Sequence, residues 1–247
     1  MPRFKDQAIC IRHFDWSETS QIVALLTEHH GKIRAVAKGA KRTSPSSVQR
    51  YSGGIELLTL GQAVGIIKPT TELATLTEWD LQQPYWHLRQ DLEAQQLSLY
   101  AADLVNALLA DRDDHPASFH ALREFLEALR DPTGRQAALL RFQWRILTDS
   151  GYRPELNRDV ERDEPLTPAA SYIFDAQAGG LTTQLGSQRT SWKVRRETVE
   201  LLRRVAQNDV DDLRDADPQA IGRANRLLCV YARSILDREL PTMAFVL

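Results

Sequence analysis

Apolar residues form short runs over the first eighty residues of the chain, separated by Gly, Pro and polar residues. Five such runs lie at residues 8–11, 22–26, 55–60, 63–67 and 73–76. A sixth segment, residues 32–38, alternates between apolar residues and the cations Lys32, Arg34 and Lys38. A period of two places these three cations on one face of a strand and the apolar residues on the other. About six closely spaced strands predict a small barrel or curled sheet over residues 1–80.

After Trp79 the apolar residues recur every three or four positions, as in amphipathic helices. We expect helices at 88–109, after Pro116, after Pro132 as far as Ser150-Gly151, and at roughly 192–206 and 218–236. Residues 153–190 are rich in Pro, Gly, Asp and Thr, with one strand-like piece at 172–174. The predicted fold class is α+β: a strand-rich domain over residues 1–80, then a helical domain over 81–247 with an irregular insert at about 153–190.

Composition excludes several classes of protein. Of the 247 residues, 43% are hydrophobic and 26% charged, which is the balance of a soluble globular protein of one or two domains. The sequence lacks both a signal-peptide pattern and an apolar run long enough to span a membrane. The two cysteines, Cys10 and Cys229, provide neither a disulfide framework nor a four-thiolate metal site. We therefore expect a reduced, cytoplasmic protein with no membrane partner.

The net charge of −2 conceals a basic stretch. Residues 29–55 contain no acidic residue, but they contain six cations: Lys32, Arg34, Lys38, Lys41, Arg42 and Arg50. Two interpretations stay open, a solvated strand face with a basic loop, or a surface that contacts nucleic-acid phosphates. In the second, Tyr51 would stack on a base, although a tyrosine in a strand-rich domain is more often partly buried.

The sequence contains none of the usual catalytic motifs: no phosphate-binding loop, no Gly-x-Ser-x-Gly and no His-Glu-x-x-His. His29 and His30 are candidate metal ligands, but adjacent side chains on a strand point to opposite faces, which favours a solvated turn before Gly31. The acidic runs 111–114 and 209–217 are interpreted as solvated loops, and the cluster at 161–164 has no partnering histidine. We predict no catalytic residues, no metal and no cofactor, and a binding protein in preference to an enzyme.

Three segments carry a resemblance to a known family. They are Ala8-Ile9-Cys10-Ile11, Trp16-Ser17-Glu18-Thr19-Ser20, and the stretch from Leu26 to Arg42 that contains Val36-Ala37-Lys38-Gly39-Ala40. In this order they resemble the RecO family of DNA recombination mediators. Weaker similarity continues at residues 73–78, 140–152 and 238–240. The resemblance implies an N-terminal OB-fold β-barrel followed by an α-helical domain.

The resemblance also implies a function. RecO-like proteins bind single- and double-stranded DNA, anneal complementary strands and, with RecR, load RecA onto DNA coated by single-stranded-DNA-binding protein. They do so in the bacterial cytoplasm, associated with the nucleoid, and are not enzymes in the bond-breaking sense. We expect the six cations of the basic stretch to contact DNA. Second-rank candidates are Lys68 and, on the helix expected at 192–206, Lys193, Arg195, Arg196, Arg203 and Arg204.

Many family members carry two Cys-x-x-Cys pairs in a zinc ribbon. The corresponding segments here, residues 157–162 and 179–186, contain no cysteine, so we predict no zinc there. For docking the acidic, apolar tail of single-stranded-DNA-binding protein, the candidates are Arg141 and Arg145, four residues apart on one helix. Two alternatives stay open: a helical interaction scaffold whose barrel binds protein instead of DNA, and a hydrolase, for which no converging carboxylates can be named.

Overall fold

The computed structural model describes residues 3–68, 70–183, 191–207, 213 and 215–247. Contacts divide the chain into two units, Met1–Arg130 and Asp131–Leu247. The change from strands to helices falls earlier, because the last strand of the first unit ends at Gln83 and two helices follow within that unit. The first unit therefore contains both a barrel and helices that pack on it.

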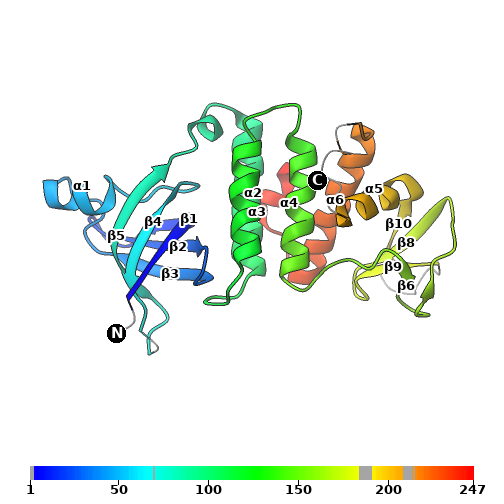
Figure 1. Cartoon of the computed structure of the whole chain (residues 1–247), viewed down its shortest axis with the longest axis horizontal. Coiled ribbons are helices and arrows are strands. Elements are labelled where there is room, and N and C mark those ends of the chain that lie inside the picture. Colours follow the sequence, from blue (N-terminus) through cyan, green and yellow to red (C-terminus); the bar gives the residue numbers. More distant parts are fainter. Residues whose placement is uncertain (1–2, 69, 184–190, 208–212, 214) are drawn as a thin grey trace. The chain divides into compact units, whose positions relative to one another are not determined.

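Five strands close into a barrel in the order β1-β2-β3-β5-β4 (Figure 1). They are β1 (Arg3–Asp15), β2 (Gln21–Thr27), β3 (Lys32–Ala37), β4 (Leu60–Ile66) and β5 (Ala74–Gln83). Neighbouring strands are antiparallel except β3 and β5, which are parallel. This is the topology of an OB-fold. The predicted α+β class, with an OB-fold barrel followed by helices, is confirmed.

The apolar run at 55–60 is not a separate strand, so the prediction of six strands is one too many. Ile55 is fully buried in the barrel core, and Leu58 adopts a left-handed backbone conformation with φ of 59°. That conformation interrupts an extended chain. The residues before it form a turn whose backbone bonds to Cys10 of β1, the Leu58 N–H donating to the Cys10 carbonyl at 2.8 Å.

The basic, Ser-rich loop expected at 40–47 runs into a short helix, α1 (Pro45–Tyr51). Pro45 suits the first turn of a helix, since its missing N–H would have no intrahelical partner there. The helix ends at Ser52, which adopts the left-handed conformation with φ of 52°. On the inner side of α1, Ser47 and Tyr51 are buried, and this anchors the basic loop to the barrel.

The rest of the first unit is helical: η1 (Trp86–Arg89), α2 (Leu92–Leu108) and α3 (Pro116–Ala128). The predicted single helix over 88–109 therefore has a short 3-10 turn before it, and Asp91 caps α2 by accepting a hydrogen bond from the Ala94 N–H at 2.9 Å. Both helices contact the barrel, α2 at β1 and α3 at β2. Gly31 allows the α2–α3 loop to approach closely, because a Cβ there would lie 2.0 Å from the Asp113 carbonyl oxygen.

The second unit contains α4 (Arg135–Asp149), α5 (Arg196–Ala206), α6 (Pro218–Leu236) and the 3-10 turn η3 (Pro241–Phe245). The boundaries predicted from Pro132, Ser150-Gly151 and Pro218 are confirmed. Helices α4 and α6 pack together, and their buried contact includes a hydrogen bond from the Gln143 amide to the Asn225 side-chain oxygen at 3.0 Å. Among the described residues no helix has the length and apolarity needed to cross a membrane.

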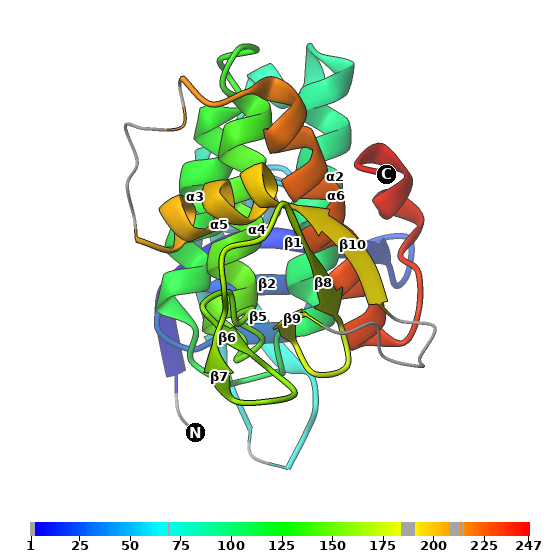
Figure 2. The ribbon, with the colours of Figure 1, turned by 90° about the vertical axis from the view of Figure 1, so that its right-hand side faces the viewer.

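The insert at 153–190 is more ordered than its composition indicated. It contains β6 (Arg158–Asp159), β7 (Glu164–Pro165), β8 (Ser171–Asp175) and β9 (Gly180–Thr182), and β10 (Ser191–Arg195) follows (Figure 2). Residues 192–195 were expected to be helical. They form an edge strand on β8 instead, because Trp192 and Val194 alternate with charged residues at a period of two before α5 begins. Residues 184–190 lie outside the described residues.

Candidate nucleic-acid interface

The outer face of strands β1, β2 and β3 carries a row of basic and aromatic side chains. Across the three strands, Arg12 pairs with Ala24 and Ala24 pairs with Arg34. Directly opposed residues on neighbouring strands share a face of the sheet, so both arginines lie on one side. Val23, next to Ala24 on β2, points to the opposite side of the sheet and is buried in the barrel core. The side that carries the two arginines is therefore the outer face.

One end of this outer face is covered by helices. Ile9 and Leu26 lie there and are fully buried. Lys32 occupies the same end and is only 7% exposed. Its ammonium donates a hydrogen bond to the Asn106 carbonyl of α2 at 2.7 Å and pairs with Asp111 at 3.2 Å. Lys32 was predicted to contact DNA. Its position in the structure makes it a cation that joins the barrel to α2, and we omit it from the interface.

The opposite end of the outer face is open. Phe14 pairs with Ile22, which pairs with Val36, so Phe14 follows Arg12 on the outer side. Phe14 is 49% exposed and Trp16, at the tip of the β1–β2 hairpin, is 67% exposed. The Arg12 guanidinium lies 5.6 Å from the centre of the Phe14 ring. Large exposed aromatic side chains beside cations are the components from which single-strand binding surfaces are built.

The β1–β2 hairpin is attached to the basic loop that follows β3. The Lys41 backbone N–H donates to the Thr19 carbonyl at 3.1 Å, and the Gly39 N–H donates to the Ser20 hydroxyl at 3.3 Å. The Lys41 ammonium forms an ion pair with Asp15 at 2.6 Å. The aromatic hairpin and the basic loop are therefore held as neighbours, although they are separated by about twenty residues of sequence.

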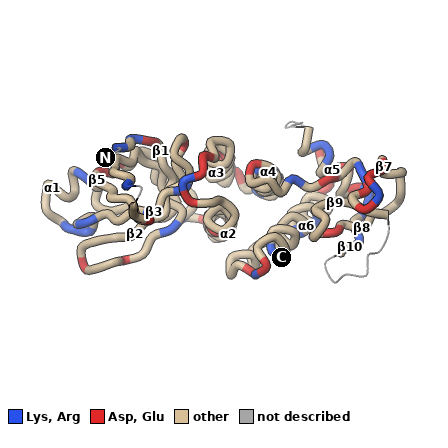
Figure 3. The backbone as a smooth tube through the Cα atoms, turned by 90° about the horizontal axis from the view of Figure 1, so that it is seen from below, with Lys and Arg blue, Asp and Glu red and all other residues tan. Residues whose placement is uncertain are grey.

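The remaining predicted cations lie on β3, in the loop that follows it and on α1. Lys38, Arg42 and Arg50 are exposed, and Figure 3 shows Lys and Arg close to α1. Arg34 is half-exposed and lies 3.8 Å from Asp111. The basic stretch is free of acids in sequence but not in space, because Asp15 and Asp111 reach it from other segments. The positive surface is consequently centred on Lys38, Arg42 and Arg50, with Arg12 and Arg34 extending it.

Tyr51 does not offer a stacking surface. Its ring is buried in the barrel core, and its hydroxyl donates a hydrogen bond to the Leu76 carbonyl at 3.0 Å. Burial raises the pKa of this hydroxyl. The exposed aromatics at the open end of the outer face are Phe14 and Trp16, which were not predicted from the sequence. Their signal was available: Arg12, Phe14 and Trp16 continue at a period of two beyond the apolar run of β1, at positions where an aromatic side chain faces solvent.

The second-rank cations are distributed over both units and over several elements. Lys68 is exposed in the first unit; Lys193 and Arg195 lie on β10 and not on a helix. Arg196 pairs with Glu200 at 2.7 Å, Arg203 donates to the Leu156 carbonyl at 3.1 Å, and Arg204 is half-buried. The predicted docking residues Arg141 and Arg145 lie on α4 and are both half-buried.

Two family models account for most of the chain. Residues 1–85 match the model described as Recombination protein O N terminal, and residues 89–244 match Recombination protein O C terminal. The chain belongs to the RecO family. The boundary between the two models falls where β5 ends and η1 begins, so the N-terminal RecO model corresponds to the barrel without α2 and α3.

Curated relatives agree with this membership. The chain is 31% identical to the DNA repair protein RecO of Anaeromyxobacter sp. (strain K) over 180 residues, 73% of this chain and 69% of the relative. It is 26% identical to the DNA repair protein RecO of Myxococcus xanthus (strain DK1622) over 246 residues, 100% of this chain and 98% of the relative. The chain is thus a member of a family of DNA repair proteins, related over its whole length.

Proposed function

We propose that this RecO family member binds single- and double-stranded DNA through the open end of the barrel's outer face. The observation that carries the proposal is the attachment of the exposed Phe14–Trp16 hairpin to the basic loop containing Lys38, Lys41 and Arg42. Phosphate contacts from the cations provide affinity without reading sequence. Stacking on the two aromatics favours unpaired bases, since every base presents a π face.

This surface suits strand annealing. Two complementary strands repel each other through their phosphates, and a cationic surface offsets that repulsion while the bases select their own partners. We propose that the protein acts by binding and not by breaking bonds, as a mediator in recombinational repair on the bacterial chromosome. Family membership supports the further proposal that it acts with RecR to load RecA onto DNA coated by single-stranded-DNA-binding protein.

The test measures DNA affinity against salt concentration. Replacing Lys38, Lys41 and Arg42 by Ala should weaken binding of a labelled single strand. The slope of log affinity against log salt should shrink by up to ~0.7 for each phosphate that the variant no longer neutralises. A matched control removes the same charge elsewhere on the first unit, at the exposed residues Arg3, Lys5 and Arg130. The control should keep more of its affinity and more of its slope.

Annealing of two complementary oligonucleotides should slow in the first triple variant and not in the control. If the two variants behave alike in both assays, the open end of the outer face is not the principal DNA surface. If neither the wild type nor the variants bind DNA, the alternative of a protein-binding barrel is favoured.

A further inference from the structure

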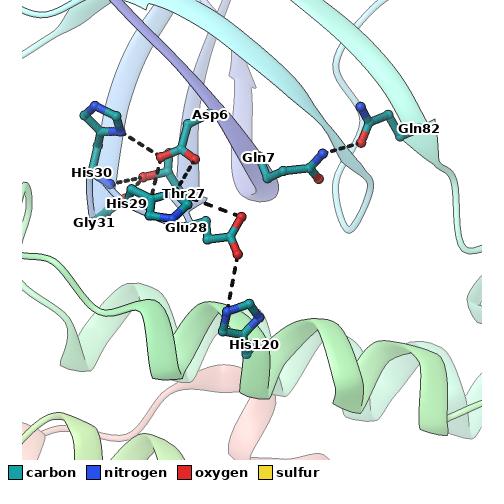
Figure 4. Close-up of polar contacts among 9 residues, drawn as sticks. All are labelled: Asp6, Gln7, Thr27, Glu28, His29, His30, Gly31, Gln82 and His120. Carbon is teal, nitrogen blue, oxygen red and sulfur yellow. Dashed lines mark hydrogen bonds and ion pairs between the residues drawn. The ribbon is translucent and has the colours of Figure 1, made fainter.

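A cluster of histidines and carboxylates lies at the covered end of the barrel, away from the open end of the outer face. It consists of Asp6 on β1, the β2–β3 turn residues Glu28, His29 and His30, and His120 on α3 (Figure 4). On a strand, His29 and His30 would point in opposite directions. They lie in a turn instead, and the Nδ1 atoms of both rings reach the carboxylate of Asp6, His29 at 3.1 Å and His30 at 2.7 Å.

The turn that presents these side chains is tightly held. The Thr27 backbone N–H and hydroxyl both donate to the Gly31 carbonyl, at 3.0 and 2.7 Å, and the same hydroxyl accepts from the His30 N–H at 3.0 Å. Gly31 adopts a φ of 65°, which glycine tolerates without strain. The His29 N–H donates to Asp6 at 2.9 Å. The ligand-bearing residues are therefore positioned by backbone contacts before any ligand arrives.

Three potential ligand atoms of the cluster lie close together. They are His29 Nδ1, one carboxylate oxygen of Asp6 and one of Glu28, and all lie within 4.8 Å of one another. The separation of His29 Nδ1 from Asp6 Oδ1 is 3.1 Å and from Glu28 Oε2 is 4.0 Å. Ligands around a tetrahedral zinc ion, at 2.0–2.2 Å from the metal, lie about 3.3–3.6 Å apart. The 3.1 Å separation is close to that spacing, and the 4.0 Å separation from Glu28 is longer.

Each carboxylate is oriented by a second histidine. The other oxygen of Asp6 accepts the contact from His30, and the other oxygen of Glu28 lies 3.3 Å from His120 Nε2. Such outer contacts fix the direction in which a ligand oxygen points and are typical of built metal sites. His29 is 69% exposed at its side chain, so a fourth position beside the three ligands faces solvent.

We propose that Asp6, Glu28 and His29 bind a divalent transition-metal ion of the zinc type, with His30 and His120 as positioning residues. An imidazole nitrogen combined with two carboxylate oxygens selects Zn²⁺ or Co²⁺ over Ca²⁺ and Mg²⁺, which prefer oxygen alone. The ion would connect β1 to the β2–β3 turn and, through His120, to α3. This site is distinct from the cysteine ribbon of other family members, whose thiolates this chain lacks.

Cobalt provides the direct test. The full chain is stripped with a chelator, dialysed and titrated with Co²⁺, followed by visible absorption and calorimetry. We expect the chain to bind one Co²⁺. The visible absorption band of the bound Co²⁺ should have the intensity characteristic of a low coordination number, and Zn²⁺ should displace the Co²⁺. Adding Zn²⁺ should raise the melting temperature of the stripped protein, because an ion that binds only the folded state stabilises it.

Variants distinguish the site from adventitious binding. Glu28→Gln and His29→Gln should each lower Co²⁺ affinity at least tenfold, and His120→Gln by about 10–100-fold. The matched control is His13→Gln on the same barrel, where the ring contacts the Ile55 carbonyl and no carboxylate of the cluster. Glu28→Gln leaves both histidine contacts to Asp6 in place, so it reports on the ion even if His29→Gln folds poorly.

Equal Co²⁺ binding by the wild type and by a Glu28→Gln, His29→Gln double variant overturns the proposal, as does a wild type that takes up no Co²⁺ at micromolar concentration. Both results would leave the cluster as a purely hydrogen-bonded joint. DNA binding is measured separately on the same variants and should be unchanged, so that failure here is independent of the proposed function.

Discussion

The carboxylate of Asp159 accepts two hydrogen bonds from Thr183, one from the backbone N–H and one from the hydroxyl, both at 2.9 Å. Its other oxygen accepts from the backbone N–H groups of Glu161 and Arg162, at 3.0 and 3.3 Å. Asp159 is buried, at the start of the insert, and Thr183 follows β9. One side chain thus fastens two distant segments of the insert together.

These segments are the ones that correspond, by family resemblance, to the cysteine pairs of a zinc ribbon. The first, 157–162, contains Asp159; the second, 179–186, contains Thr183, with residues 184–186 outside the described part of the chain. A second link between them is the backbone bond from the Val160 N–H to the Leu181 carbonyl at 3.0 Å. Within the described residues, a buried carboxylate joins the segments that thiolates and zinc join elsewhere in the family.

Replacing Asp159 by Ala should therefore destabilise the second unit. The substitution leaves the donors of Thr183 and Glu161 without their acceptor, and hydrogen bonds to charged groups contribute about 1.5–3 kcal/mol. We expect the free energy of unfolding in urea to fall by about 2–3 kcal/mol. Glu164→Ala, at a neighbouring exposed carboxylate on β7, is the control. A decrease no larger than that of the control would mean that Asp159 is not the fastening residue.

Lowering the pH should weaken the contact between Asp159 and Thr183, because it protonates the Asp159 carboxylate. Burial raises the pKa of Asp159, but the hydrogen bonds from Thr183, Glu161 and Thr182 outweigh it and lower the pKa to about 2. Because this pKa lies below the ordinary value of 3.8, the carboxylate's contribution to stability is present at neutral pH. It is lost as the pH falls from about 4 to about 2. Asp159→Asn should show a shallower fall in melting temperature over that interval than the wild type; equal slopes would contradict the assignment.

Trp16 should carry a large share of single-strand affinity. Truncation of a stacking aromatic costs about 1–3 kcal/mol per base. We expect Trp16→Ala to weaken binding of a single strand by that amount, and to weaken duplex binding less, since paired bases are not available for stacking. Trp86→Ala is the matched control, because Trp86 is 62% exposed on the same unit and lies in η1. Equal effects at the two tryptophans, measured by fluorescence anisotropy, would remove the hairpin from the interface.

Replacing Lys32 should have the opposite effect to replacing Trp16: it should lower stability and leave DNA binding unchanged. Its ammonium is buried against the Asn106 carbonyl and Asp111, so Lys32→Met removes charge-assisted bonds between the barrel and α2. We expect the melting temperature to fall, with a decrease in unfolding free energy of about 1–3 kcal/mol. At temperatures where the variant is folded, the salt dependence of DNA binding should match the wild type. A shallower salt slope would restore Lys32 to the DNA surface.

For Lys32 and Arg34, the face of the strand could be predicted from the sequence, but the covering of one end of that face could not. Alternation correctly placed Lys32 and Arg34 on the same side of β3, because the period of a strand is local, whereas Lys38 lies in the turn after the strand. Which end of that side is covered depends on α2 and α3, which lie some seventy residues later and leave no trace in the pattern. Helix boundaries at Pro116 and Pro218 were predicted correctly, since proline and capping residues act locally.

The candidate sites were harder to predict than the fold for the same reason. Asp6 and His30 are 24 residues apart, and their contact depends on the pairing of β1 with β2. The turn before Gly31 was predicted from the sequence, but its contact with Asp6 was not. The sequence contains Phe14 and Trp16, but it does not show that they are exposed, because their exposure follows from the hairpin extending past the barrel core. Long-range contacts set both outcomes, and periodicity reports only local structure.

We predict that the acidic tail of single-stranded-DNA-binding protein docks on the second unit. The tail combines carboxylates with an aromatic side chain, so it needs an apolar groove rimmed by cations. Arg141, from the Leu-Arg-Phe element of α4, is the residue we propose for this contact. The second unit also contains a groove of about 240 Å³ between β10, α5 and α6, with Trp192 and Leu227 among its lining residues and Arg223 and Arg226 beside them.

The two candidate docking sites, α4 and the groove lined by β10, α5 and α6, can be distinguished by the affinity of arginine variants for a labelled tail peptide. If α4 is the docking helix, Arg141→Ala should lower peptide affinity about tenfold, and Arg226→Ala should leave it unchanged, because the two arginines lie on different helices. Higher salt should weaken the wild type towards the variant, since salt screens the ion pair that only the wild type can form. The reverse order of effects, with both variants shown to be folded by circular dichroism, would assign the tail to the β10–α6 groove and remove Arg141 from the contact.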